Sequence, residues 1–135
     1  MPPERLALLH SPAERWERAA PHEVTLVAEH AGELVAFAVV RRSMDTDADP
    51  WRTGELDTFY ALPSSWGRGV GQRLMRAALD ALRARRYREA TLWTAEQNER
   101  PRRIYEAAGW EFDGAQRQRT FLGVELIELR YRITL

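Results

Sequence analysis

Three glycines within five positions constrain this chain more than any other feature of its sequence. Gly67, Gly69 and Gly71 stand in the stretch PSSWGRGVGQRLM (63–75), just before an amphipathic run of Leu, Met, Arg and Ala. Because glycine is about 1 kcal/mol less favourable than alanine inside a helix, a helix that begins here must gain something from bare backbone. A strand, a glycine-rich turn and a helix N-terminus in succession leave backbone N–H groups unpaired, where the helix dipole is positive.

Unpaired N–H groups at a positive helix end predict a site for a phosphate. Glycine lets the anion approach without a Cβ in the way, and Arg68 adds a formal charge beside it. The spacing matches neither the G-x-x-x-x-G-K-[ST] turn of P-loop NTPases nor the G-x-G-x-x-G turn of dinucleotide-binding folds. The alternatives are a turn that serves tight packing alone and a structural domain that binds nucleotide phosphates.

Strand-like and helix-like segments alternate around this turn. Alternating patterns predict a hairpin over 23–29 and 33–42 and a strand over 55–62. The helix that starts at Val70 carries one apolar stripe, formed by Leu74, Met75, Ala78, Leu79 and Leu82. A strand at 89–95, a helix at 98–109 and a closing pair of strands follow. This order predicts an α/β (α+β) fold, with a mixed sheet and helices over it.

The N-terminal segment is expected to be helical, in two pieces. Residues 3–20 (PERLALLHSPAERWERAA) have helical spacing, which Pro12 interrupts. About 22 residues therefore precede the first recognisable strand.

Composition excludes several classes of function. Twenty basic residues balance twenty acidic ones among 135, which disfavours nucleic acid as a partner. The absence of cysteine excludes disulfides, thiolate metal sites and a cysteine nucleophile. His10, His22 and His30 match no metal-ligand spacing, so no metal is expected.

Length and hydropathy predict one domain over residues 1–135. No apolar run approaches 18 residues, and the N-terminus lacks the apolar core of a signal peptide. We therefore expect a cytoplasmic protein with no membrane partner.

Two segments together resemble the GNAT superfamily of acetyl-CoA-dependent N-acetyltransferases. They are ELDTFYALPSSWGRGVGQRLM (55–75) and LWTAEQNERPRRIYEAAGW (92–110), and the likeness runs from about Glu23 to the C-terminus. The family pattern Q/R-x-x-G-x-G/A falls on residues 66–71, where Trp66 departs from the first position. The resemblance implies that the loop and helix start bind the pyrophosphate of CoA mainly through the backbone. The residues concerned are Trp66, Gly67, Arg68, Gly69, Val70, Gly71 and Gln72.

The second segment contributes two polar side chains. Asn98 and Tyr105 are seven residues apart, two helical turns, so they project from nearly the same face. The resemblance implies that Asn98 contacts the pantetheine arm and that Tyr105 protonates the departing CoA thiolate. Asn98 as a helix N-cap and Tyr105 as a core aromatic are the alternatives.

The strand before the loop carries the candidate base. Strand alternation predicts that Glu55, Asp57, Phe59 and Ala61 share one face. The resemblance implies that Glu55 acts as the general base; Asp57 and a water molecule remain alternatives. It also implies that the backbone of residues 60–62 (Tyr60, Ala61 and Leu62) faces the cofactor, because family members splay this strand from the next parallel one.

The resemblance implies an enzyme that transfers acetyl directly from acetyl-CoA to a small amine or amino-acid-like acceptor. Acetylation of a protein N-terminus or lysine, and a non-catalytic acyl-CoA-binding module, are the alternatives. The resemblance also implies a mixed, mainly antiparallel sheet with helices on both faces. The first strand of the family is expected to be missing. Either a partner subunit, such as a second copy in a homodimer, covers the open sheet edge, or a segment upstream of this sequence supplies the strand.

Overall fold

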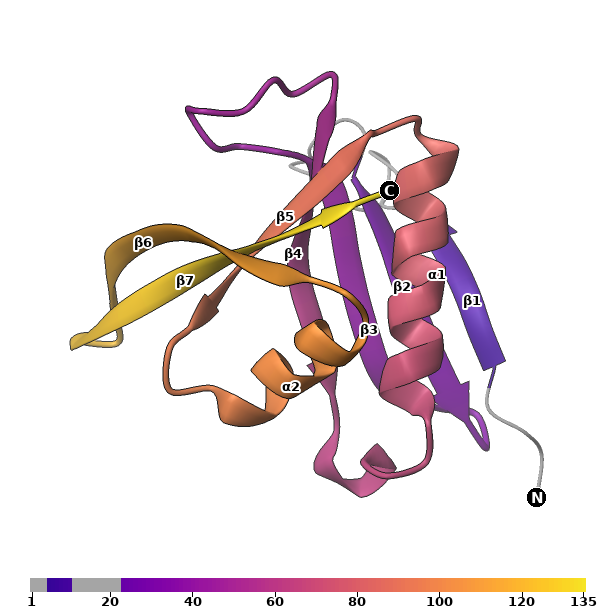
Figure 1. Ribbon diagram of the computed structural model, residues 1–135. Helices are drawn as coiled ribbons and strands as arrows, with labels where there is room; N and C mark the ends of the chain where they lie inside the picture. Colours follow the sequence, from indigo (N-terminus) through magenta and orange to yellow (C-terminus); the bar gives the residue numbers. More distant parts are fainter. Residues whose placement is uncertain (1–4, 11–22) are drawn as a thin grey trace.

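The computed structural model describes residues 5–10 and 23–135, which form one seven-stranded sheet and two α-helices (Figure 1). The strand order is β1-β2-β3-β4-β5-β7-β6, and among these described strands only β4 and β5 pair in parallel. In chain order the elements are β1 (Arg5–His10), β2 (Val24–His30), β3 (Glu33–Arg42), β4 (Thr53–Ala61), a 3₁₀ turn (Pro63–Ser65), α1 (Val70–Ala84), β5 (Glu89–Ala95), α2 (Glu99–Ala107), β6 (Glu111–Phe121) and β7 (Val124–Thr134). The expected mixed, mainly antiparallel sheet is confirmed.

The N-terminal segment contains a strand where the sequence predicted a helix. Residues 5–10 form a strand, β1, which pairs antiparallel with β2 from Arg5 opposite Glu29 to His10 opposite Val24. The helix expected there is wrong, and so is the expected absence of a first strand. Pairing with β2 gives this backbone hydrogen-bond partners that local helical spacing cannot reveal. The edge of β2 is thus covered by the chain itself; Pro12 and the rest of 11–22 lie outside the described residues.

The apolar stripe of α1 is buried as predicted. Leu74, Met75, Ala78, Leu79 and Leu82 all lie in the core, at most 8% exposed, against residues of β2, β3 and β4. The indole N–H of Trp110, just after α2, donates to the sulfur of Met75 at 3.4 Å. Both described helices therefore cover the same face of the sheet, and no helix covers the opposite face within the described ranges.

β4 contains an irregularity that decides which side chains share a face. Val39 lies opposite Thr58, but Val40 lies opposite Leu56, so one extra residue of β4 is accommodated at Asp57. This β-bulge breaks the alternation. Glu55 and Asp57 share the face away from the helices, whereas Phe59 packs against the core. The prediction that Glu55, Asp57, Phe59 and Ala61 share a face is wrong for the last two.

Replacing Gly54 with Ala is expected to lower the free energy of unfolding by about 1–3 kcal/mol, because overpacking forces neighbours to move. A Cβ at Gly54 would lie 2.6 Å from Leu82 Cδ2 and 2.7 Å from Tyr87 Cδ2. Urea unfolding measures the change. Gly71→Ala is the matched control, since its Cβ would meet only Ile104 Cδ1, at 3.9 Å. An equal stability in both variants would contradict this packing.

Candidate active site

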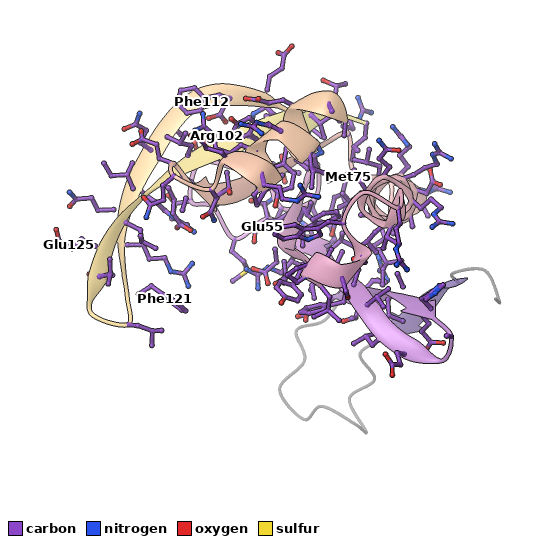
Figure 2. All side chains as sticks on the ribbon, turned by 90° about the horizontal axis from the view of Figure 1, so that it is seen from below. Glu55, Met75, Arg102, Phe112, Phe121 and Glu125 are labelled. Carbon is purple, nitrogen blue, oxygen red and sulfur yellow. The ribbon has the colours of Figure 1, made fainter. Side chains whose placement is uncertain are left out.

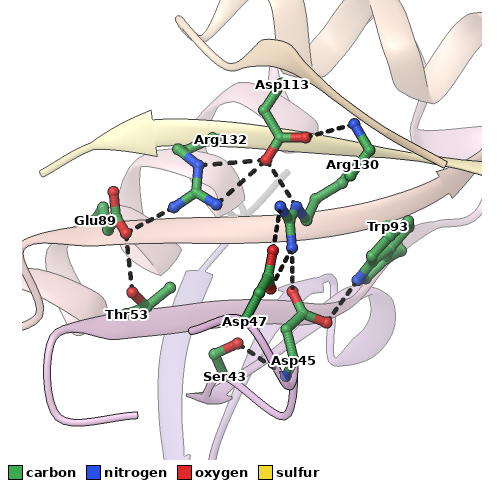
Figure 3. A network of polar contacts seen from close by, with 10 residues as sticks. Ser43, Asp45, Asp47, Thr53, Glu89, Trp93, Asp113, Arg130 and Arg132 are labelled. Carbon is green, nitrogen blue, oxygen red and sulfur yellow. Dashed lines mark hydrogen bonds and ion pairs between the residues drawn. The ribbon is translucent and has the colours of Figure 1, made fainter. Parts of the chain in front are cut away.

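The site is built around a gap between β4 and β5. Their parallel ladder joins only Thr53, Gly54 and Glu55 to Glu89, Ala90 and Thr91, although both strands continue beyond it. Side chains tie the closed end: Thr53 Oγ1 donates to Glu89 at 2.9 Å, and Arg132 donates to the same carboxylate at 2.6 Å (Figure 3). From Glu55 onward the strands splay apart, as the family resemblance implies.

The glycine turn lies at the end of β4, beyond the splayed segment. None of the backbone N–H groups of residues 67–72 makes a hydrogen bond of good geometry within the described part of the chain. Gly67 and Gly69 have φ of +80° and +77°, a conformation that favours glycine, and a Cβ on either would meet nothing within 4 Å. The turn and the N-terminus of the fifteen-residue α1 thus expose a run of donors at a positive helix end.

A hollow of about 360 Å³ adjoins these donors. Its lining includes Gly67, Gly69 and Gly71, together with Trp66 and Arg100. The Arg100 guanidinium carbon lies 4.0 Å from the centre of the Trp66 ring. Trp66, which departs from the family pattern, thus forms a wall of the hollow and places a second cation beside the donors.

The side chains of this segment contribute unequally. Val70 is 2% exposed, so its side chain belongs to the core and only its backbone N–H is available to a ligand. Arg68 and Gln72 are exposed, and Gln72 also lines the hollow.

The backbone of residues 60–62, at the end of β4, is expected from the resemblance to face the cofactor, but its groups point in two directions. The N–H of Leu62 donates to the carbonyl of Val35 at 2.8 Å, so it faces β3. Because backbone groups alternate in direction along a strand, the N–H of Tyr60 also faces β3, and the N–H of Ala61 faces the gap. The Ala61 carbonyl accepts the indole N–H of Trp66 at 3.1 Å. Of the three residues, Ala61 is the one whose N–H is directed at the gap.

Tyr105 lies beside the gap, on the helix-covered face. Its ring contacts Phe59 of β4 and Tyr131 of β7, with ring centres 6.0 and 6.3 Å apart. The side chain is 6% exposed, and burial raises the pKa of its hydroxyl to about 12. The hydroxyl makes no hydrogen bond to any other described residue. It is therefore a protonated phenol at neutral pH, with its donor free.

Asn98 occupies the N-cap position of α2, as the sequence allows. Its side chain makes no capping hydrogen bond, however, and the residue is exposed. Asn98 therefore stands at the N-cap position, but its side-chain amide does not cap the helix.

Glu55 lies at the point where β4 and β5 separate, on the opposite face from Tyr105. It is 5% exposed, and Arg41 of β3 donates to its Oε2 from Nε at 3.1 Å and from Nη2 at 2.8 Å. Burial raises the pKa of Glu55 in spite of the opposing effect of Arg41. Oε1 accepts no hydrogen bond from the described residues, so one carboxylate oxygen is left to accept a proton.

Asp57, the alternative base, is more fully occupied. Its Oδ1 lies 2.8 Å from Arg41 Nη2, and its Oδ2 accepts the Thr58 hydroxyl at 2.9 Å. Arg41 thus holds both candidate carboxylates, and the sequence analysis missed it. The pairing of Arg41 opposite Glu55 in the β3–β4 ladder would have revealed it, had the register been known.

Comparisons with known proteins identify the family. Residues 2–110 match the family model described as "Acetyltransferase (GNAT) family". The chain is 31% identical over 91 residues to a protein of Archaeoglobus fulgidus named as an uncharacterized N-acetyltransferase, covering 67% of this chain and 62% of that protein. It is 35% identical over 98 residues to the mycothiol acetyltransferase of Sanguibacter keddieii, covering 73% of this chain and 30% of that protein.

The chain thus spans less than two thirds of the length of either relative. A solved structure shares its fold along nearly the whole chain. It is a GNAT family acetyltransferase from Elizabethkingia anophelis with acetyl-CoA bound, with a TM-score of 0.71, 12% identity and 98% of both chains covered. No helix in the described ranges is both long and apolar enough to span a membrane. On its match to the family model and on this fold, the chain belongs to the GNAT family of acetyltransferases.

Proposed function

We propose that this chain is an acetyl-CoA-dependent N-acetyltransferase that acts directly on a primary amine of a small or amino-acid-like molecule. The run of unpaired N–H groups from residue 67 to 72, beside the gap between β4 and β5, carries the proposal. A pyrophosphate fits these donors, and Arg68 and Arg100 supply cations. The gap would hold the extended pantetheine arm on its way toward Glu55, with Asn98 as a polar contact of the arm and the Ala61 N–H directed at the acetyl end.

Acetyl-CoA supplies an activated acetyl thioester, and the chain supplies the groups around it. Glu55 Oε1 takes a proton from the attacking amine, directly or through water. The Ala61 N–H faces the gap, where a donor stabilises charge on the acetyl oxygen. Tyr105 donates its proton to the departing thiolate. Because Glu55 and Tyr105 lie on opposite faces of the sheet, the amine enters from one side and the thiol leaves from the other.

The activity is tested by measuring thiol release from acetyl-CoA against a panel of amines. The panel contains simple amines, amino acids, a peptide with a free N-terminus and a peptide with an internal lysine. Faster thiol release with the small amines supports the proposal. Thiol release with the peptides alone would mean that the acceptor is a protein and not a small molecule. Acetyl-CoA binding without release from any amine would instead show a non-catalytic acyl-CoA-binding module. The ion pair between Glu55 and Arg41 is the observation that favours this second candidate.

The glycine turn gives a binding prediction. Acetyl-CoA at a hundredfold excess over Kd is expected to stabilise the protein by about 2.7 kcal/mol, seen as a rise in Tm. Gly69→Glu should abolish that rise, because it places a carboxylate among the donors and strains a backbone with φ +77°. Gly123→Glu is the matched control, since Gly123 has the same φ of +77° and equally open surroundings at the β6–β7 turn. A full rise in the Gly69 variant would exclude the turn as the phosphate site.

A further inference from the structure

A second hollow, of about 240 Å³, opens on the face of the sheet that bears Glu55. Glu55 and Asp57 of β4 form one end, and Trp93 of β5 lies between the ends. Arg117 and Arg119 of β6, with Glu128 of β7, form the other end. These last residues belong to a long β6–β7 arm that twists away from the sheet and carries Phe121 and Glu125 near its tip, far from Met75 on α1 (Figures 1 and 2).

The two ends of this hollow carry opposite charge. At the β4 end one guanidinium, that of Arg41, faces two carboxylates, which leaves an excess negative charge. At the arm end one carboxylate, that of Glu128, faces two guanidinium groups, which leaves an excess positive charge. Arg117 Nε lies 2.8 Å from Glu128 Oε1, whereas Arg119 Nη1 lies 3.9 Å from the same oxygen. Arg119 is therefore the cation with the weaker internal partner, and its side chain is 57% exposed.

The floor of the hollow is held in place by buried polar contacts (Figure 3). The Trp93 indole N–H donates to Asp45 Oδ1 at 2.9 Å, and Asp45 Oδ2 accepts Arg130 at 3.3 Å. Arg130 is itself only 7% exposed and also bonds Asp47 and Asp113. The Arg117 guanidinium lies 4.1 Å from the centre of the Trp93 ring. Trp93, which lies between the charged ends, is thus held by contacts on both its indole N–H and its ring face.

The spacing of the ends suits a short bifunctional molecule. β5 and β7 lie between β4 and β6 in the sheet, so the spacing across the strands is on the order of 14 Å. The register adds an offset along the strands, because Glu55 is level with Arg132 of β7 whereas Arg119 pairs with Leu126. Both ends still line the same hollow of about 240 Å³. Glutamate and arginine side chains reach inward from both strands and shorten this gap. A ligand of several bonds, with an amine at one end and an anion at the other, bridges what remains.

We infer that the acceptor is a zwitterion: its amine lies at Glu55 and a carboxylate at its other end is bound by Arg119. This inference rests on the proposed function, since it names the acceptor of that reaction. Planar guanidinium groups pair with carboxylates through two parallel hydrogen bonds, and Trp93 covers one side of the chain that joins the two groups. The arm is therefore a specificity element, and Arg119 is its anion-binding residue.

The test measures binding by calorimetry in the presence of CoA, which carries no acetyl group and so allows no turnover. The probes are glycine, β-alanine, 4-aminobutyrate and 6-aminohexanoate, each compared with its carboxamide. At least one acid is expected to bind about tenfold more tightly than its own amide. Arg119→Gln should remove this preference, and Glu128→Gln should enlarge it, because it removes the carboxylate that competes for Arg119. Arg83→Gln, which removes a similarly exposed cation from α1, is the matched control.

Equal binding of acids and amides overturns the inference, as does the absence of binding by every acid. A preference that survives Arg119→Gln, or that does not grow in Glu128→Gln, also overturns it. The result is separate from that of the proposed function. If amines release thiol but acids bind no better than their amides, the zwitterion inference is wrong and the proposed function stands. If acids bind better but no amine releases thiol, the zwitterion site stands and the catalytic assignment is wrong.

Discussion

Tyr105→Phe is expected to slow acetyl transfer about 10²-fold while acetyl-CoA affinity changes by no more than a few-fold. A positioned acid contributes ~10²-fold or more, and a thiolate is already a fair leaving group, so the loss falls at the low end of that range. Phe keeps the ring contacts with Phe59 and Tyr131 and removes only the hydroxyl, which has no hydrogen-bond partner among the described residues. Stability should therefore change little, because no internal hydrogen bond is lost.

Single-turnover transfer at saturating acetyl-CoA measures this effect, with unfolding followed in parallel. Burial raises the pKa of Tyr105 to about 12, so the parent enzyme keeps this proton and its rate should not decline between pH 7 and 10 for want of it. Tyr87→Phe is the control, because burial also raises the pKa of Tyr87, which lies away from the gap. A Tyr105 variant that loses stability yet transfers acetyl at the parent rate would make Tyr105 a core aromatic only.

Glu55→Gln is expected to lower kcat at pH 7 by about 10²-fold and to recover part of the rate as pH rises. An amine of lysine type has a pKa near 10.4, so without a base few acceptor molecules are neutral at pH 7. Because a base acts in its deprotonated form, the parent rate should rise with pH as Glu55 loses its proton. Burial raises the pKa of Glu55, so this rise lies above the pH range of an exposed glutamate. This rise is the acidic limb of the pH profile, and the Glu55→Gln variant should lack it. The rate of the variant should rise only at higher pH, where the amine itself loses its proton.

The pH profile of kcat, measured with acetyl-CoA binding as a check on folding, decides the assignment. Asp57→Asn is the matched control: Asp57 shares Arg41 but has both carboxylate oxygens engaged. Loss of the limb in the Asp57 variant, with an unchanged profile for Glu55→Gln, would transfer the base role to Asp57. Unchanged profiles in both variants would mean that solvent water, and neither carboxylate, takes the proton from the amine.

Local pattern was sufficient for most of the elements and for the glycine turn on which the proposed cofactor site depends. The strands over 33–42 and 89–95 and the start of α1 at Val70 lie where alternation and the apolar stripe place them. The glycine turn could be recognised because φ values near +80° at Gly67 and Gly69 are a local requirement, which the residue type itself reports. The family motif around Asn98 and Tyr105 is likewise contiguous in sequence.

Tertiary structure decided the rest, because it depends on register and on contacts between distant segments. β1 exists through pairing with β2, and the bulge at Asp57 is defined only against β3, so neither is visible in its own segment. Pairing across strands brings Arg41 to Glu55. The charged ends of the second hollow come from β4 and the β6–β7 arm, and their residues are at least 60 positions apart along the chain. A side chain's type was readable from the sequence, but its partner, its face and the pKa that burial gives it were set by packing.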